Sequence, residues 1–246
     1  MIISTSNVVA NNTPVLTAGT ISSGSLAEVL DPNFAKVISS SSTTFAFTVG
    51  GITSCKYIAL HGLKLLIGVV VTITVYGDGF SDSISYTIDS NNVSNLVFRV
   101  TGVDLTNIEI SVTGTGVKTI SYVQAGDATV VPWGTDAGQS LYYLGYNSVN
   151  RTSSDKLGAP VIRTQNKISP KLRLNIKNVS KTWVRDDLQK IFNHYQKYGV
   201  LSILDYETDS RPNESVAGFN LENVSVKTHS DTLSLCNVSF SLQVSV

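Results

Sequence analysis

The sequence predicts a mainly β protein, with an N-terminal antiparallel, jelly-roll-like β-sandwich followed by a smaller α+β domain that has one main helix. Between residues 43 and 123, short segments of alternating apolar and polar residues recur about every 8–12 residues, separated by turn residues. Residues 183–198 instead follow the 3–4 spacing of an amphipathic helix. Charged residues make up only 15% of the chain, below the roughly 25% typical of soluble domains.

The predicted sandwich is organised around residues 55–79. Residues 57–60 are uniformly apolar, which indicates a strand covered on both faces, and His61-Gly62 interrupts the run. Residues 71–76 alternate as a half-buried strand does, and Gly77-Asp78-Gly79 ends it. Residues 26–30 predict one helical turn, which Asp31-Pro32 stops. The other strands predicted in this part are 43–49, 83–88, 96–100, 108–112 and 119–123.

A change in charge along the chain predicts the domain organisation. Five of the eighteen basic residues precede residue 131, which leaves thirteen for the rest. We expect an N-terminal arm at 1–40, the sandwich at 41–130, a linker at 131–165 and the α+β domain at 166–246.

The α+β domain is predicted as strand 171–176, helix 183–198, strand 200–204, a strand or strand pair at 216–226 and a final strand. Thr182 is the expected N-cap and Gly199 the expected C′ residue. Apolar and polar residues alternate from Cys236 to the end, whereas Leu233 and Leu235 lie on the opposite parity. This change of phase predicts a bulge near Leu235. The final strand is expected to expose an edge that pairs with a neighbouring chain.

No catalytic, cofactor or metal residue is predicted. Cys55 and Cys236 are interpreted as buried free thiols, with a disulfide between them left open. The sequence holds no GxSxG, GxGxxG or CxxC motif, and Asp78 and Asp82 lack the spacing of an EF-hand. The histidines are expected at the surface or at caps rather than as general bases, and the acidic loop as a solvated turn. These residues are His61, His194 and His229, and Asp205, Glu207 and Asp209.

The charge pattern also argues against nucleic acid and membrane partners. Eighteen basic and eighteen acidic residues cancel, so no basic field is present. The longest apolar run is broken by Lys64, Gly68 and Thr72 and is too short to span a bilayer. A modest basic stripe is interpreted as the solvated face of a strand. Its residues are Lys167, Lys171, Arg173, Lys177 and Lys181.

Four aromatic residues gather after the sandwich. Exposed aromatic rings stack on sugars, and they also anchor subunit contacts or pack between domains. All three roles stay open for this cluster, which consists of Trp133, Tyr142, Tyr143 and Tyr146.

Two regions of the chain carry a family resemblance. YIALHGLKL followed by VTITVYG resembles the core strand pair of galactose-binding-like (discoidin-type) jelly rolls found in tailed-bacteriophage proteins, although Lys64 stands where Asn is usual. Residues 168–204 together with the closing VSFSLQVSV resemble the C-terminal part of phage tail or baseplate proteins.

The resemblance implies a non-enzymatic structural component of a virion, tail or baseplate, assembled in the host cytoplasm. Its implied partners are copies of itself, in a ring or tube, and other virion proteins. The alternative is a carbohydrate-binding module that recognises a glycan, such as one on a host surface, through the aromatic cluster.

Overall fold

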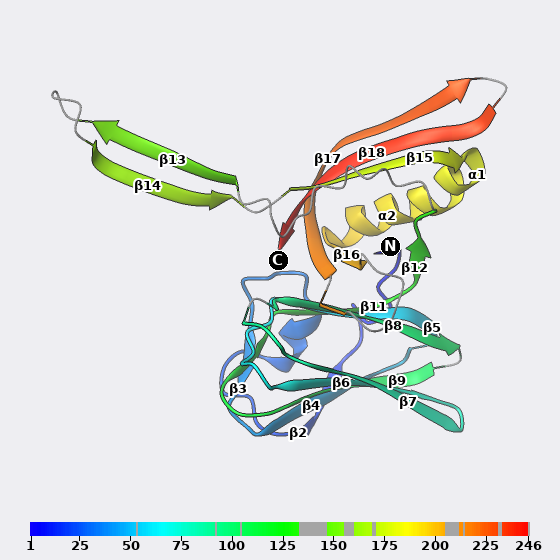
Figure 1. Cartoon of the computed structure of the whole chain (residues 1–246). Coiled ribbons are helices and arrows are strands. Elements are labelled where there is room, and N and C mark those ends of the chain that lie inside the picture. The colour runs from blue at the N-terminus through cyan, green and yellow to red at the C-terminus, as the bar shows by residue number, and fades with distance from the viewer. Residues whose placement is uncertain are drawn as a thin grey trace.

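The structure is a computed structural model that describes residues 1–52, 54–91, 93–103, 105–132, 147–154, 160–168, 171–204, 212–213, 215–230 and 233–245. It confirms the predicted fold class. Every described strand pair is antiparallel, and one long helical segment lies in the C-terminal part (Figure 1).

The first half of the chain holds strands β1 (Ile2–Ser4), β2 (Pro14–Ala18), β3 (Ile38–Ser40), β4 (Thr44–Gly50), β5 (Ser54–His61), β6 (Val70–Gly77), β7 (Phe80–Thr87), β8 (Asn95–Val103), β9 (Leu105–Thr113), β10 (Lys118–Ile120), β11 (Tyr122–Gly126) and β12 (Ala128–Val130), and a short 3₁₀ helix, Leu26–Leu30. The second half holds β13 (Asn147–Ser154), β14 (Pro160–Ile168), β15 (Lys171–Ser180), β16 (Leu201–Leu204), β17 (Ser215–Ser230) and β18 (Leu233–Ser245), and the helical segment of α1 (Lys181–Trp183), a π-helical turn (Val184–Leu188) and α2 (Gln189–Tyr198).

The sandwich packs a five-stranded sheet, in the order β2-β4-β9-β6-β7, against a three-stranded sheet, in the order β11-β5-β8. The alternation of apolar and polar residues in the sequence matches the alternation of buried and exposed side chains. On β6, Val71, Ile73 and Val75 are buried, while Thr72 and Thr74 are half-exposed. β5 is central in one sheet and β6 lies in the other, so residues 55–79 do supply both layers of this core.

The break at His61-Gly62 has a steric cause. Gly62 has φ +64°, and a Cβ at this position would lie 2.3 Å from the Ser121 hydroxyl oxygen. Only glycine turns the chain here without displacing the neighbouring strand.

The second domain is built on a six-stranded sheet in the order β12-β1-β16-β17-β18-β15. Its β1 comes from the first four residues and pairs with both β12 and β16. The sandwich therefore lies, in sequence, inside the connection between two neighbouring strands of the second sheet. The backbone N–H of Thr5 donates to the Asp127 carbonyl at 2.8 Å, where the chain enters and leaves the sandwich.

Residues 1–40, predicted as an arm, contribute strands to both domains. β1 joins the second sheet, whereas β2 pairs with β4 and β3 pairs with β10. The sequence did not predict these strands, because short polar segments carry no signal for the distant strands with which they pair. The remaining boundaries, 41–130, 131–165 and 166–246, stay a prediction.

The helical segment begins at Lys181, two residues before the prediction. The predicted N-cap, Thr182, is wrong: the Ser180 hydroxyl accepts from the Trp183 N–H at 3.0 Å. Gly199 is confirmed at the C-terminus, with φ +70° and its N–H donating to the Tyr195 carbonyl. Leu188 and Ile191 pack on the sheet.

The final strand does not offer an edge. β18 is paired along both sides, with β15 and β17, so its predicted role in pairing with a neighbouring chain is wrong. The predicted bulge is confirmed, because Thr228 to Ser230 on β17 faces Cys236 to Leu233 on β18, which leaves one extra residue in β18.

Candidate functional site

The aromatic cluster predicted as a sugar-binding or subunit contact lies outside the described residues. This holds for Trp133, Tyr142, Tyr143 and Tyr146, and also for the acidic residues Asp205, Glu207 and Asp209. The candidate site is therefore built from three other features: the junction between the domains, a groove on the six-stranded sheet and a projecting two-stranded ribbon.

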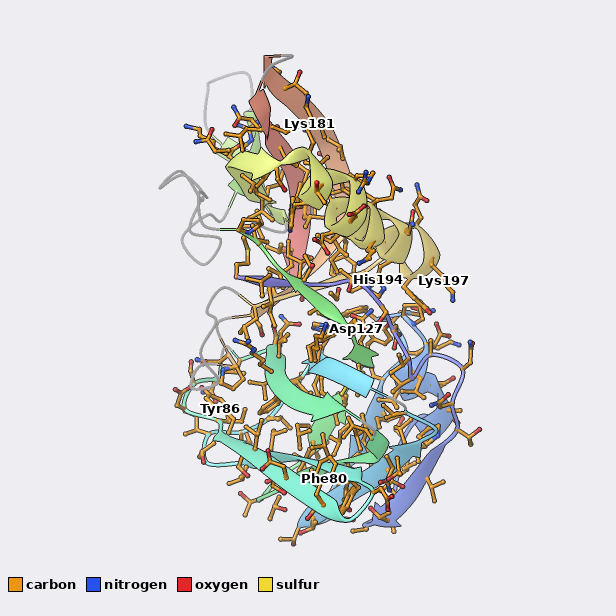
Figure 2. All side chains as sticks on the ribbon, turned by 90° about the vertical axis from the view of Figure 1, so that its right-hand side faces the viewer. Phe80, Tyr86, Asp127, Lys181, His194 and Lys197 are labelled. Atoms are coloured by element: carbon orange, nitrogen blue, oxygen red, sulfur yellow. The ribbon has the colours of Figure 1, made fainter. Side chains whose placement is uncertain are left out.

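The junction between the domains is a packed interface. Phe34, from the sandwich, meets Phe219 of β17 edge-on at 4.8 Å between ring centroids and also contacts Tyr122. A second apolar cluster joins residues of both domains: Ile2, Tyr57, Ala59, Val97 and Leu204. In Figure 2, Asp127 at the top of the sandwich and His194 on the helix both lie in the zone where the domains meet.

A chain of buried polar side chains crosses this junction. His61 Nδ1 lies 2.9 Å from Asn95 Oδ1, and its Nε2 lies 2.8 Å from Ser202 Oγ. Ser202 Oγ is 2.5 Å from Gln124 Oε1, and Gln124 Nε2 is 2.8 Å from His194 Nε2. His61, Asn95 and Gln124 come from the sandwich, whereas Ser202 and His194 come from the second domain.

The hydrogen bonds of this polar chain need His61 to be neutral. Ser202 has one proton but faces two acceptors, His61 Nε2 and Gln124 Oε1. With the Gln124 amide turned by 180°, its Nε2 donates to Ser202, and His194 Nε2–H donates to the amide oxygen. Each of these contacts then has one donor and one acceptor. A proton added to His61 would break its bond to Ser202.

Burial favours the neutral form of both His61 and His194. Desolvation lowers the pKa of His61 from 6.5 to about 4, with Asn95 opposing the change, and it lowers the pKa of His194 to about 4, helped by Lys197. The expectation that these histidines lie at the surface or at caps is wrong. Their partners lie far away in sequence, so no local pattern announces them.

Ser202, His61 and Asn95 have the connectivity of a nucleophile, a base and an orienting group. The structure does not make them a catalytic site. All three are buried, at 2%, 0% and 2% exposure, and Ser202 is also held by Gln124. A substrate has no access to the hydroxyl. We interpret this group as the polar core of the domain junction.

A groove of about 260 Å³ crosses the outer face of β15, β18 and β17. Its residues form two rows across the three strands, and the strand register places Asn237 beside Lys227 and Ser239 beside Ser225. Short serine and asparagine side chains form the floor, and two exposed lysines flank it. The lining residues are Asn175, Ile176, Lys177, Ser225, Lys227, Asn237, Val238 and Ser239.

The predicted basic stripe borders this groove. Lys171, Arg173 and Lys177 are exposed at alternating positions of β15, as the sequence indicated. Lys171 Nζ lies 2.8 Å from Glu222 Oε2, which is an exposed ion pair. The Asn178 N–H donates to Asn237 Oδ1 at 3.1 Å, so the amide NH₂ of Asn237 is the end left to face the groove.

One ribbon extends from the body in Figure 1. β13 and β14 pair with each other and with no other strand of the described chain, and their ribbon points away from both domains. The β17–β18 hairpin is different, because β15 pairs with β18 along its length. β16 covers β17 only from Leu201 to Leu204, opposite residues 215–218, so the rest of β17 is an edge of the described sheet.

The described residues hold no group of three or more His, Cys, Asp and Glu side chains that could bind a metal ion. Cys55 and Cys236 are free and buried, as predicted, and burial raises the pKa of Cys55 to about 12. None of the described helices has the length and apolar character of a membrane span.

No family model and no curated protein matches this sequence. Solved structures similar to the chain include a fucose binding module of Streptococcus pneumoniae (14% identity, 49% of this chain and 96% of that one, TM-score 0.39). Others are the lectin binding domain of lectinolysin complexed with Lewis b (12%, 52% and 99%, 0.43) and the C-terminal domain of a chitobiase from Bacteroides fragilis (17%, 52% and 100%, 0.39). Values this low carry no argument about function, and the fold rests on the strand pairing above.

Proposed function

We propose that this chain is a non-catalytic structural protein that assembles with copies of itself. The observation that carries the proposal is the β13–β14 ribbon (Asn147–Ser154 and Pro160–Ile168), which extends from the body and has no third strand beside it among the described residues. An isolated two-stranded ribbon is at best marginally stable in water. A neighbouring molecule that packs against the ribbon supplies the missing layer.

The outer part of β17 supports the same proposal. Val224 and Val226 of β17 are 46% and 45% exposed, on the part of the strand that lies beyond β16. Exposed apolar side chains on an edge strand are suited to burial at a subunit contact.

An arm that reaches from one copy onto a different surface of the next makes a head-to-tail contact. Such contacts close into a ring when the rotation between copies closes, and otherwise continue as a filament. Rings and tubes are the assemblies that the sequence resemblance implies, so we propose the tail or baseplate of a tailed phage as the setting, with other virion proteins as further partners.

The test replaces residues 147–168 with a short Gly/Ser linker and measures particle mass by light scattering. The full chain is expected to form an oligomer of defined mass, and the shortened chain a folded monomer with an unchanged near-ultraviolet spectrum. Leu66→Ser/Ile67→Ser is the matched control, because it removes exposed apolar side chains from a sandwich loop. A monomeric full chain, or an oligomer that survives the replacement, contradicts the proposal.

Electron microscopy of the full chain tests the setting. Rings or stacked rings of one symmetry are expected. Particles without rotational symmetry would speak against a tail or baseplate component.

Carbohydrate binding is the second candidate. It is favoured by four aromatic residues within fourteen positions of sequence, Trp133, Tyr142, Tyr143 and Tyr146. A glycan array is expected to show binding that Trp133→Ala abolishes. The absence of binding to any glycan at millimolar concentration argues against this function, as does binding that the substitution leaves intact.

A further inference from the structure

We propose that strand β7 of one copy is the edge on which strand β13 of the next copy docks, so that the β13–β14 ribbon adds two strands to the five-stranded sheet. This inference rests on the proposed function, because it takes contact between copies through the ribbon as given and names the surface that receives it. Three features support it: the exposure of β7, the charges of the two partners and their positions in Figure 1.

β7 is an exposed and regular edge of the sandwich. It ends the sheet β2-β4-β9-β6-β7, and six of its eight residues are exposed. It pairs with β6 without a register shift and contains no proline, lysine or arginine. Natural edge strands are usually blunted by such features, so an edge without them is suited to pairing with another strand.

The other described edges of the sandwich are protected. β2, at the opposite end of the same sheet, has five residues, begins with Pro14 and is shifted in register against β4. β3 and β10 are only three residues long. In the three-stranded sheet β11 is buried throughout, and β8 is buried at residues 95–98, where the Val97 N–H donates to the Pro212 carbonyl at 2.9 Å. β7 is therefore the sandwich edge most open to an added strand.

The charges around β7 select a basic partner. Residues 77–89, which comprise β7 and its flanking turns, contain Asp78, Asp82 and Asp89 and no basic residue. Phe80 stands between the first two of these and is 42% exposed. An arginine suits this combination, because its guanidinium stacks on an aromatic ring and forms charge-assisted hydrogen bonds with carboxylates.

The ribbon has the complementary charge. Its two strands contain Arg151, Arg163 and Lys167 and no acidic residue, so three positive charges oppose the three negative charges of residues 77–89. A second copy of β7 is a poor partner for β7, because the same three carboxylates would then meet across the contact.

β13 is the strand of the ribbon that fits this edge. Both β13 and β7 have eight residues, and β13 contains no proline, whereas β14 begins with Pro160. Docking through β13 leaves β14 outermost, and its proline and basic residues then protect the new edge. In Figure 1 the ribbon extends to the upper left, whereas β7 lies at the lower right of the sandwich. The strand that docks on β7 therefore comes from another copy.

Asp82 has a second role at this edge. The Ser83 N–H donates to Asp82 Oδ1 at 2.9 Å, which occupies one backbone donor of β7. A guanidinium that binds this carboxylate competes with the N–H and frees it for a carbonyl of the added strand.

The test mixes two chains that are each expected to be monomeric. One has residues 147–168 replaced by a Gly/Ser linker, and the other carries Phe80→Ser/Asp82→Lys on β7. Light scattering is expected to show a dimer only in the mixture, because the ribbon of the second chain docks on the intact β7 of the first. Asp82→Lys alone, which keeps Phe80, is expected to weaken association of the full chain by about tenfold.

Val15→Ser/Leu16→Lys is the matched control, because it changes exposed residues of β2, the other edge of the same sheet. This variant is expected to keep the particle mass of the full chain. An unchanged near-ultraviolet spectrum shows that each variant is folded.

Three results would overturn the assignment. They are a Phe80→Ser/Asp82→Lys chain that keeps the particle mass of the full chain, a mixture that stays monomeric, or an equal loss of mass in the β2 control. If the ribbon replacement still converts an oligomer into a monomer, self-assembly through the ribbon stands and only the docking edge is wrong. A monomeric full chain contradicts both proposals.

Discussion

The two sheets that face solvent in this molecule are built differently. The five-stranded sheet of the sandwich is the more regular one: β4–β9 and β6–β7 pair without a register shift, and β2–β4 and β6–β9 have one shift each, near a strand end. The pairs β15–β18 and β17–β18 contain four shifts between them. Positive φ in the sandwich falls on glycines at turns, whereas in the second domain it falls on Gly199 after the helix and on three asparagines inside strands.

The outer faces differ in the same way. Hydroxyl groups pair across the strands of the sandwich, as Thr72 with Ser85 at 2.8 Å and Thr74 with Ser83 at 2.9 Å. The face of the second sheet carries lysines, amides and a groove. Irregular backbone of this kind is kept only where the rest of the structure enforces it.

The largest loss of stability is expected from substitutions in the two hydrophobic cores, and it should be similar in both domains. Phe47→Ala in the sandwich and Phe240→Ala in the second core each lower the free energy of unfolding by about 3–5 kcal/mol. Because the domain junction is packed, both variants are expected to unfold in one transition in guanidinium. Two separate transitions would show that the domains are independent.

A smaller effect is expected from the junction as pH falls. Both buried histidines have a pKa lowered from 6.5 to about 4, so the unfolded chain binds protons that the folded chain does not. Stability is complete above about pH 6.5 and falls towards pH 4, by about 3 kcal/mol for each histidine. Urea unfolding of wild type and of His61→Gln at pH 7.5 and 4.5 measures this. A pH dependence that is the same in both contradicts a role for His61.

The bulges are expected to contribute less. Asn178→Ala places a residue that disfavours the left-handed conformation at φ +58° and costs about 1–2 kcal/mol of unfolding free energy. Asn178→Gly is the matched control and should cost less than Ala. Thermal unfolding of the two variants gives the comparison, and a glycine variant less stable than the alanine variant would mean that φ is not the cause.

The smallest effect is expected on the sandwich face. Thr74→Ala, Ser83→Ala and the double variant should each change unfolding free energy by about 0.5 kcal/mol or less, because these hydroxyls also bond to water. Chemical denaturation measures it. A loss above about 2 kcal/mol would mean that the hydroxyl pairs stabilise the sheet.

Much of the fold was predictable because it depends on local pattern. Alternation located β4, β6, β9 and β18, and the 3–4 spacing with Gly199 located the helix. The phase change near Leu235 predicted a bulge that exists. In each case the signal and the structure lie in the same few residues.

What could not be predicted depends on distant partners. His61 finds Asn95 and Ser202, 34 and 141 positions away, so it is buried although its local sequence resembles a turn. The final strand has the alternation of an edge as well as of a centre, and only β15 and β17 decide between them. The groove combines three strands, none of which carries a recognisable motif alone.

The position of β1 has a consequence for how the chain folds during synthesis. Ile2 and Ile3 leave the ribosome long before their neighbours in the sheet, β12 and β16, which begin at residues 128 and 201. β1 therefore stays unpaired while the sandwich is synthesised and folds, and the second sheet can form only afterwards. A folded sandwich then holds Thr5 beside Asp127, which replaces the search for a distant partner by a short closure. In this sense the sandwich acts as a template for the domain that encloses it in sequence.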